Sequence, residues 1–172
     1  MKPNNIKQSL DFNKIRSEFP ILNRKINNNP IVYLDSAASA QKPKIVMETL
    51  RSAYLETYSN VHRGLHWLSE QSTSKYENVR TKVAEFLGAS SSNEIVFGSG
   101  ATQLINLVAN SWGRKFLKKN DEIIITIADH HANIVPWQLI SQQTGSKIIA
   151  VPVDNQGNFD IEDLKKIISN KT

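Results

Sequence analysis

The sequence predicts an α/β domain built on a mostly parallel sheet. From residue 94 onward, short apolar segments typical of strands alternate with segments in which apolar residues recur at helical spacing. One strand candidate, DEIIITIA at 121–128, is a continuous apolar run of the kind found in buried parallel strands. The chain has 172 residues, of which 40% are hydrophobic, and this is enough for one domain with a core of its own.

The first half of the chain is predicted to be mainly helical. Asp11 is placed to cap a first short helix, which Pro20 ends, and Gly88 is placed to close the longest one. The segment NRKINNNP has the composition of a turn before the apolar run IVYL at 31–34. The predicted helices cover residues 12–19, 42–58 and 69–87.

In the second half, strands and helices are predicted to alternate. The predicted strands cover residues 94–98, 121–128 and 147–154. The predicted helices cover residues 101–117, 133–145 and 160–169. Because the chain stops after a helix, where the alternation calls for another strand, we expect the sequence to be part of a larger protein.

Composition excludes several classes of protein. The net charge is +5, but the lysines are scattered or lie near predicted helix ends, without the clustered charge and aromatic residues of a nucleic-acid surface. No apolar run approaches the roughly 20 residues needed to cross a bilayer, and the first residues lack the apolar core of a signal peptide. A cytoplasmic protein without nucleic-acid or membrane partners is therefore expected. With no cysteine, these residues supply no disulfide, thiolate metal site or cysteine nucleophile.

Two predicted strand ends carry residues suited to chemistry, because ligands of open α/β sheets bind beyond the carboxyl ends of the strands. After the first, the turn Gly98-Ser99-Gly100 leads into a helix whose first turn, with the hydroxyl of Thr102, suits an anion such as phosphate. The local pattern alone is equally compatible with a plain strand–helix turn. After the second strand come His130 and His131, which are placed to face the same crevice or to cap the next helix.

The remaining histidines, His62 and His66, are four residues apart in NVHRGLHWLSE, where Arg63 is a candidate to hold a carboxylate. A zinc pair at this spacing needs a continuous helix, but Gly64 lies between them and no HExxH motif is present. A metal module using all four histidines is therefore a minor alternative, and no metal ligand is assigned.

Four separate motifs, in order along the chain, resemble one known family. They are YLDSAASAQKP at 33–43, VHRGLHWLSEQST at 61–73, GSGATQLINLVANSWG at 98–113 and DHHANIVPWQ at 129–138. Together they are similar to the cysteine desulfurases of the class V aminotransferases, and most similar to the Suf-type branch related to selenocysteine lyases. The resemblance runs from about residue 10 to the end and matches the N-terminal part of the family pattern.

The resemblance implies the aspartate-aminotransferase fold, known as fold type I of pyridoxal-phosphate (PLP) enzymes. Residues 1–20 would be an N-terminal arm with a short helix, and residues 21–172 the first portion of the PLP-binding large domain. It further implies a homodimeric transferase that converts L-cysteine to L-alanine and leaves sulfur as a persulfide for iron–sulfur cluster assembly. L-Selenocysteine would be an alternative substrate, and a Suf-type protein would accept the sulfur.

The resemblance also assigns roles to residues. Ala101 and Thr102 match the cup for the cofactor phosphate, and His130 matches the catalytic histidine stacked on the pyridine ring. His62 and Arg63 match a loop near the substrate, and Ala37 and Asn133 match positions that line the approach to it. Gln103 stands where close relatives have an acidic residue that helps to organise the dimer interface.

One departure from the family pattern is large. The Schiff-base lysine of the family follows a histidine, and no His-Lys pair occurs here; the persulfide cysteine is also missing. Both lie later in the family pattern, so the 172 residues alone are expected to be inactive. The alternative is a non-enzymatic remnant of such an enzyme.

Overall fold

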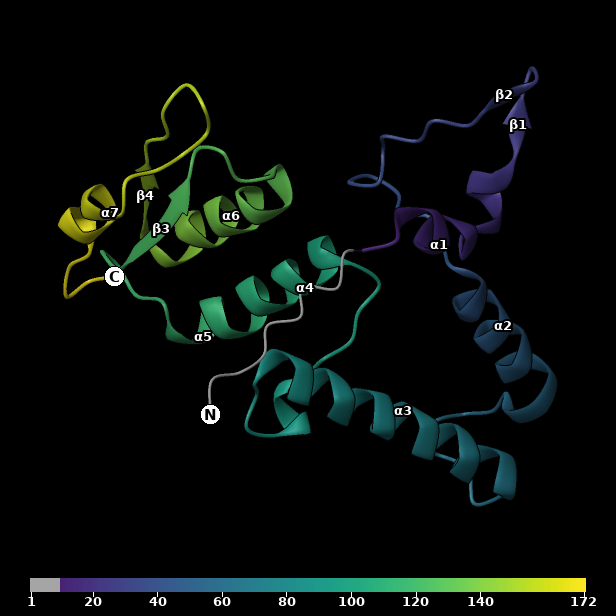
Figure 1. Cartoon of the computed structure of the whole chain (residues 1–172). Helices are drawn as coiled ribbons and strands as arrows, with labels where there is room; N and C mark the ends of the chain where they lie inside the picture. Colours follow the sequence, from purple (N-terminus) through teal and green to yellow (C-terminus); the bar gives the residue numbers. More distant parts are fainter. Residues whose placement is uncertain (1–9) are drawn as a thin grey trace, which may run out of the picture. The chain divides into compact units, whose positions relative to one another are not determined.

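The computed structural model describes residues 10–172, which form two compact units that meet at the Ile95–Val96 bond. Figure 1 shows the elements of both units along the chain. The predicted arm at residues 1–20 lies partly outside the described residues, which begin at Leu10. That domain boundary remains a prediction.

The first unit is mainly helical, as the sequence predicts. Its longer helices are α1 (Phe12–Ser17), α2 (Lys44–Ser52), continued by the π-helical turn η2 (Ala53–Thr57), and α3 (Trp67–Leu87). Its shorter elements are η1 (Pro20–Asn23), the strands β1 (Lys25–Ile26) and β2 (Asn29–Pro30), and η3 (Ser92–Glu94).

Local sequence signals explain the ends of these elements. The Asp11 side chain caps α1 by accepting a hydrogen bond from the backbone N–H of Lys14, at 3.0 Å. Between β1 and β2, Asn27 and Asn28 both have positive φ, at 51° and 64°, which is the geometry of a tight antiparallel hairpin. Gly88 closes α3 in the left-handed conformation at φ 72°. The predicted caps and the predicted turn are therefore confirmed.

The second unit contains the parallel strand pair that the sequence predicts. Its elements are α4 (Ala101–Val108), the π-helical turn η4 (Ala109–Gly113), α5 (Arg114–Phe116), β3 (Glu122–Thr126), η5 (His131–Asn133), α6 (Val135–Thr144), β4 (Lys147–Val151) and α7 (Ile161–Ile167). β3 and β4 pair in parallel, in a register that runs from Glu122 opposite Lys147 to Thr126 opposite Val151. The buried apolar side chains of this unit include Ala109, Ile125, Ile140 and Val151.

The predicted strand at 94–98 is wrong. Residues 95–98 follow η3 without forming a strand, and the Val96 and Phe97 side chains are 61% and 41% exposed. A strand requires a partner for its backbone N–H and C=O groups. Within residues 10–172, β3 pairs with β4 and no third strand joins them. The apolar composition of 94–98 is compatible with a strand, but composition alone does not show whether a neighbouring strand is available for pairing.

Candidate active site

The loop before α4 provides one half of the candidate site. Gly100, the N-cap residue of α4, has extended backbone and no side chain to cap the helix, and an added Cβ there would meet no atom within 4 Å. The positive end of the helix thus has no side-chain cap from its N-cap residue, and the Thr102 side chain in its first turn is exposed. Gln103 steadies the loop, since its Oε1 accepts hydrogen bonds from the backbone N–H of Ser99, at 2.7 Å, and from its hydroxyl, at 3.0 Å.

The turn that follows β3 provides the second half. The Asp129 carboxylate accepts a hydrogen bond from the backbone N–H of Thr126 at 2.9 Å and so fixes the direction in which the chain leaves the strand. His130 then caps η5, because its Nδ1 accepts from the backbone N–H of Ala132 at 3.0 Å. With Nδ1 engaged as an acceptor, a neutral His130 ring carries its proton on Nε2.

The two halves lie side by side within the second unit. α4 packs against η5, so Ala101 and Thr102 are on an element adjacent to the one that His130 caps. That these residues share one crevice remains a prediction. Asn133 also lies in η5, where its Oδ1 accepts from the Trp137 Nε1–H at 3.1 Å. This hydrogen bond links Asn133, which is expected to line the approach to the site, to α6.

His62 and Arg63 belong to the first unit, in the loop between η2 and α3. His62 has the left-handed conformation at φ 67°, and its Nε2 lies 2.6 Å from Glu77 Oε1. Its ring also meets the Tyr76 ring edge-on, with centroids 5.6 Å apart. Arg63 is exposed. The loop is thus ordered around His62 by contacts with α3.

Ala37 lies at the tip of an exposed turn in the same unit. The backbone N–H of Ser39 donates to the Asp35 carbonyl at 3.0 Å, which closes the turn over four residues. The Tyr33 hydroxyl holds the turn from one side, since it lies 2.5 Å from the Ser39 carbonyl oxygen. Ala37 is therefore presented on a braced turn with its small side chain exposed.

The four histidines occupy different local roles. His62 contacts Glu77, His66 caps α3 by accepting from the backbone N–H of Ser69, and His130 caps η5. His131 is exposed at the start of η5. Over the part of the chain that the structure describes, no group of three His, Asp or Glu side chains is close enough to hold a metal ion.

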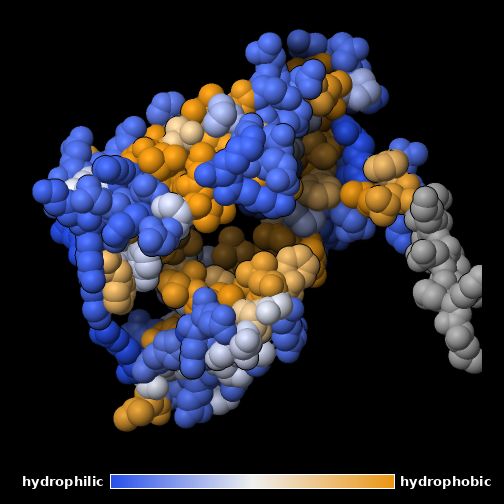
Figure 2. All heavy atoms as spheres, turned by 90° about the vertical axis from the view of Figure 1, so that its left-hand side faces the viewer, coloured by the Kyte–Doolittle hydropathy of each residue, from blue (hydrophilic) through white to orange (hydrophobic). Residues whose placement is uncertain are grey.

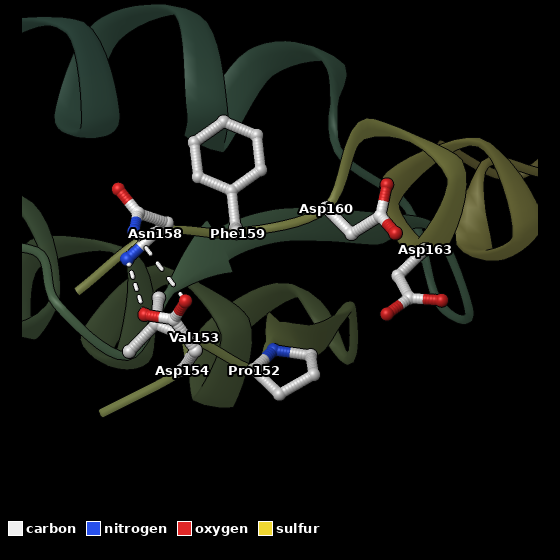
Figure 3. Close-up of a pocket in the computed structure, with 7 residues that line it drawn as sticks. All are labelled: Pro152, Val153, Asp154, Asn158, Phe159, Asp160 and Asp163. Carbon is white, nitrogen blue, oxygen red and sulfur yellow. Dashed lines mark hydrogen bonds between the residues drawn. The ribbon is translucent and has the colours of Figure 1, made fainter. Parts of the chain in front are cut away.

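A separate cavity of about 430 Å³ lies between β4 and α7 (Figure 3). Its acidic side chains already have partners. Asp154 accepts from the backbone N–H groups of Asn158 and Gln156, and these hydrogen bonds lower the pKa of its carboxyl group. Asp160 caps α7, and Asp163 pairs with Lys166 at 2.7 Å. The carboxylates that line this cavity are therefore engaged in contacts within their own segment, and they do not form a cluster of unpaired side chains that could bind a ligand.

Several residues that hold the candidate side chains in place were not predicted from the sequence. Asp129 sets the turn before His130, and Glu77 and Thr73 of α3 contact His62. The spacing of Thr73 and Glu77, one helical turn apart on α3, was the signal that could have suggested a shared face. What that face contacts depends on the path of the preceding loop.

The chain is similar to known proteins over most of its length. The model of the class V aminotransferase family matches residues 32–172. A probable cysteine desulfurase of Synechocystis is 51% identical over 158 residues, which are 92% of this chain and 38% of that protein. A cysteine desulfurase of Yersinia pseudotuberculosis is 49% identical over 164 residues, or 95% of this chain and 40% of that protein.

Solved structures show the same relationship. The apo structure of a cysteine desulfurase from Thermococcus onnurineus is 37% identical and superposes with a TM-score of 0.80 over 90% of this chain and 36% of that one. The chain belongs to the class V aminotransferase family, and its fold is a portion of the fold-type-I architecture. It spans about two fifths of the length of the curated relatives it matches. No helix among residues 10–172 is both long enough and apolar enough to span a membrane.

Proposed function

We propose that this chain is the N-terminal part of a PLP-dependent cysteine desulfurase. The complete enzyme would convert L-cysteine to L-alanine and pass the sulfur, as a persulfide, towards iron–sulfur cluster assembly. The observation that carries the proposal is the uncapped N-terminus of α4, with Thr102 exposed in its first turn, packed beside the element that His130 caps.

The residues present fit the proposed cofactor. A phosphate dianion needs N–H donors and positive potential, and the first turn of α4 offers both, without a side-chain cap that competes for them. The open space around Gly100 leaves room for the phosphate to approach the backbone. Ala101 N–H and the Thr102 hydroxyl would hold the phosphate. When bound, PLP supplies the electron sink for cleavage of bonds at the substrate α-carbon.

His130 would orient the bound cofactor and exchange protons with the group that lies against its ring. Because Nδ1 accepts from Ala132, Nε2 is the ring nitrogen that remains for a bound group. A neutral ring in this state donates a hydrogen bond through Nε2, and its flat face is suited to stacking on an aromatic cofactor. Asp129 supports this role indirectly, since it fixes the turn from which His130 projects.

The loop with His62 and Arg63 would act on the substrate. A guanidinium binds a carboxylate through two parallel hydrogen bonds, so Arg63 is suited to the carboxylate of cysteine. Ala37 and Asn133 would line the approach to the site. Finer assignments follow the family resemblance: a homodimer in the cytoplasm, a Suf-type sulfur acceptor, L-selenocysteine as a second substrate, and domain boundaries at residues 20 and 21.

The test uses the full-length protein and its Thr102→Val variant. We expect the wild-type protein to release alanine from L-cysteine, and we expect the variant to bind PLP about tenfold more weakly, since it loses a hydrogen bond to a charged phosphate. Cofactor affinity is read from absorbance titration of the apoprotein. Thr81→Val is the matched control, because the Thr81 hydroxyl donates to the Glu77 carbonyl of its own helix. A wild-type protein that binds PLP but forms no alanine would disprove the proposed activity.

A further inference from the structure

We propose that Ser69, Thr73 and Glu77 of α3 form a positioning stripe that holds the loop 60–64 and so presents His62 and Arg63 to the substrate. The proposal deepens the proposed function and rests on the assignment of that loop to the substrate. The three residues of the positioning stripe are spaced four apart, so they lie in a row along one face of α3. None of them touches a reacting atom under this proposal, and their role is to set the loop.

Each residue of the stripe holds a different point of the loop. Ser69 is buried, with 1% of its surface exposed. Its hydroxyl donates to the Asn60 carbonyl at 2.7 Å and accepts from the Gly64 N–H at 3.0 Å. These two bonds join both ends of the loop at a single side chain.

The other two residues of the stripe hold the middle of the loop. The Thr73 hydroxyl oxygen accepts from the backbone N–H of His62 at 2.9 Å. One turn further along α3, Glu77 Oε1 lies 2.6 Å from His62 Nε2. His62 is thus held at both its backbone and its side chain, and Arg63 lies between two residues whose N–H groups are bonded to α3.

The loop needs this support because its backbone is in a rarely populated conformation. His62 has φ 67°, a left-handed geometry that costs free energy in a residue other than glycine. Gly64 is constrained in another way, since a Cβ added there would lie 2.5 Å from both Cβ and Oγ of Ser69. The close approach of the loop to α3 and the strained His62 backbone persist together because the stripe bonds to both.

The stripe also fixes which nitrogen of His62 remains for a ligand. Nε2 is engaged by Glu77, whose second oxygen, Oε2, accepts from Arg80 at 3.0 Å. The carboxylate is therefore held between two donors, and a neutral His62 ring keeps Nδ1 as an acceptor. His62 and Thr73 both line a cavity of about 480 Å³ beside this loop.

Two residues further along the same face of α3 serve as controls for the positioning stripe. Thr81 and Glu85 continue the four-residue spacing beyond the loop. The Thr81 hydroxyl donates to the Glu77 carbonyl within the helix, and Glu85 is exposed. Thr73 and Thr81 therefore form a matched pair that differs in contact with the loop, whereas Glu77 differs from Glu85 also by its ion pair with Arg80.

The experiment compares Thr73→Val and Glu77→Ala with Thr81→Val and Glu85→Ala in the full-length protein. Amide hydrogen exchange of the peptide around residues 60–64 is measured together with kcat and KM for L-cysteine. We expect exchange to be about fivefold faster in the two stripe variants, as for the loss of one hydrogen bond. We expect kcat/KM to fall about 10- to 100-fold, as for a displaced binding group. Thr73→Ser and Glu77→Gln, which keep an acceptor, should restore much of both values, and the melting temperature of Thr73→Val should shift no more than that of Thr81→Val.

The outcomes separate this proposal from the proposed function. Exchange and kcat/KM equal to those of the control variants would overturn the positioning stripe. Faster exchange with unchanged kcat/KM would overturn its role towards the substrate and leave the desulfurase activity standing. A wild-type protein without desulfurase activity would overturn the proposed function instead, and the exchange measurement would still report whether the stripe holds the loop.

Discussion

The His130 ring is fixed by a short-range hydrogen bond to the backbone two residues further along the chain. Its Nδ1 accepts from the Ala132 N–H, and Asp129 closes the turn just before it. The ring orientation is therefore set by residues 126–132 and needs no contact with distant parts of the chain. The neighbouring His131 shares the sequence context but caps nothing in the structure and is exposed.

This difference between the two histidines leads to a test in the full-length enzyme. We expect His130→Ala to lower kcat about 100-fold, the usual size of a lost proton-transfer group. The free energy of unfolding should change by less than about 1 kcal/mol, because the lost hydrogen bond is exposed. His131→Ala should alter neither value. Steady-state kinetics and denaturant unfolding make the comparison, and equal kcat in both variants would mean that His130 acts only as a cap.

At the scale of elements, much of the fold follows from sequence signals that act locally. The left-handed residues Gly88 and Gly145 close α3 and α6 where the sequence places them. The parallel pair β3–β4 also follows from its apolar runs. These signals work because each depends on a few neighbouring residues.

Features that depend on distant partners could not be predicted. Among the described residues, the segment 94–98 does not form the expected strand, and the predicted helix 101–117 contains the π-helical turn η4. In the candidate site, His130 and Thr102 were predicted from strand-end patterns; α4 packs against η5, and their roles remain predictions. The positioning stripe was missed because Ser, Thr and Glu four residues apart are common on exposed helix faces. Only the path of the preceding loop distinguishes this stripe from such a face.

The glycines that close α3 and α6 allow a prediction about the free energy of unfolding. Gly145 has φ 75°, and an added Cβ would lie 3.3 Å from Lys119 Cγ, whereas the corresponding site at Gly88, with φ 72°, is open. We expect Gly88→Ala to destabilise the full-length protein by about 1 kcal/mol through the left-handed backbone alone. Gly145→Ala should cost more, about 1–2 kcal/mol, because it adds crowding. Denaturant unfolding at equilibrium measures both, and a larger loss for Gly88→Ala would contradict this account.

At the scale of the whole molecule, the described residues leave many large apolar side chains exposed. Leu34, Leu65 and Phe86 are each at least 89% exposed, and Figure 2 shows apolar residues reaching the surface on the face it presents. Contiguous apolar patches on a protein surface usually mark places that another segment or chain covers. This exposure is compatible with a chain that spans about two fifths of its relatives.

The residue content of the whole chain also determines the activity that we expect of these 172 residues. They contain no cysteine and no His-Lys pair, so they provide neither a persulfide acceptor nor the lysine expected from the family resemblance. We expect the purified 172-residue chain to form alanine from L-cysteine no faster than free PLP does. Incubation with L-cysteine and PLP, followed by quantification of alanine, tests this. Alanine formation above the level of free PLP would show that the chain needs no further residues for the reaction.

The register of β3 and β4 has a consequence for how the molecule is made. Paired residues are 25 positions apart throughout, as in Glu122 and Lys147, where 147 − 122 = 25. The connection between the two strands includes the ten residues of α6 (Val135–Thr144), so the strands pair across a crossover and not across a tight turn. The crossover has to close before these contacts form, which makes parallel pairing slower than hairpin formation. During synthesis the complete register becomes available only once Val151, the partner of Thr126, has been added to the chain.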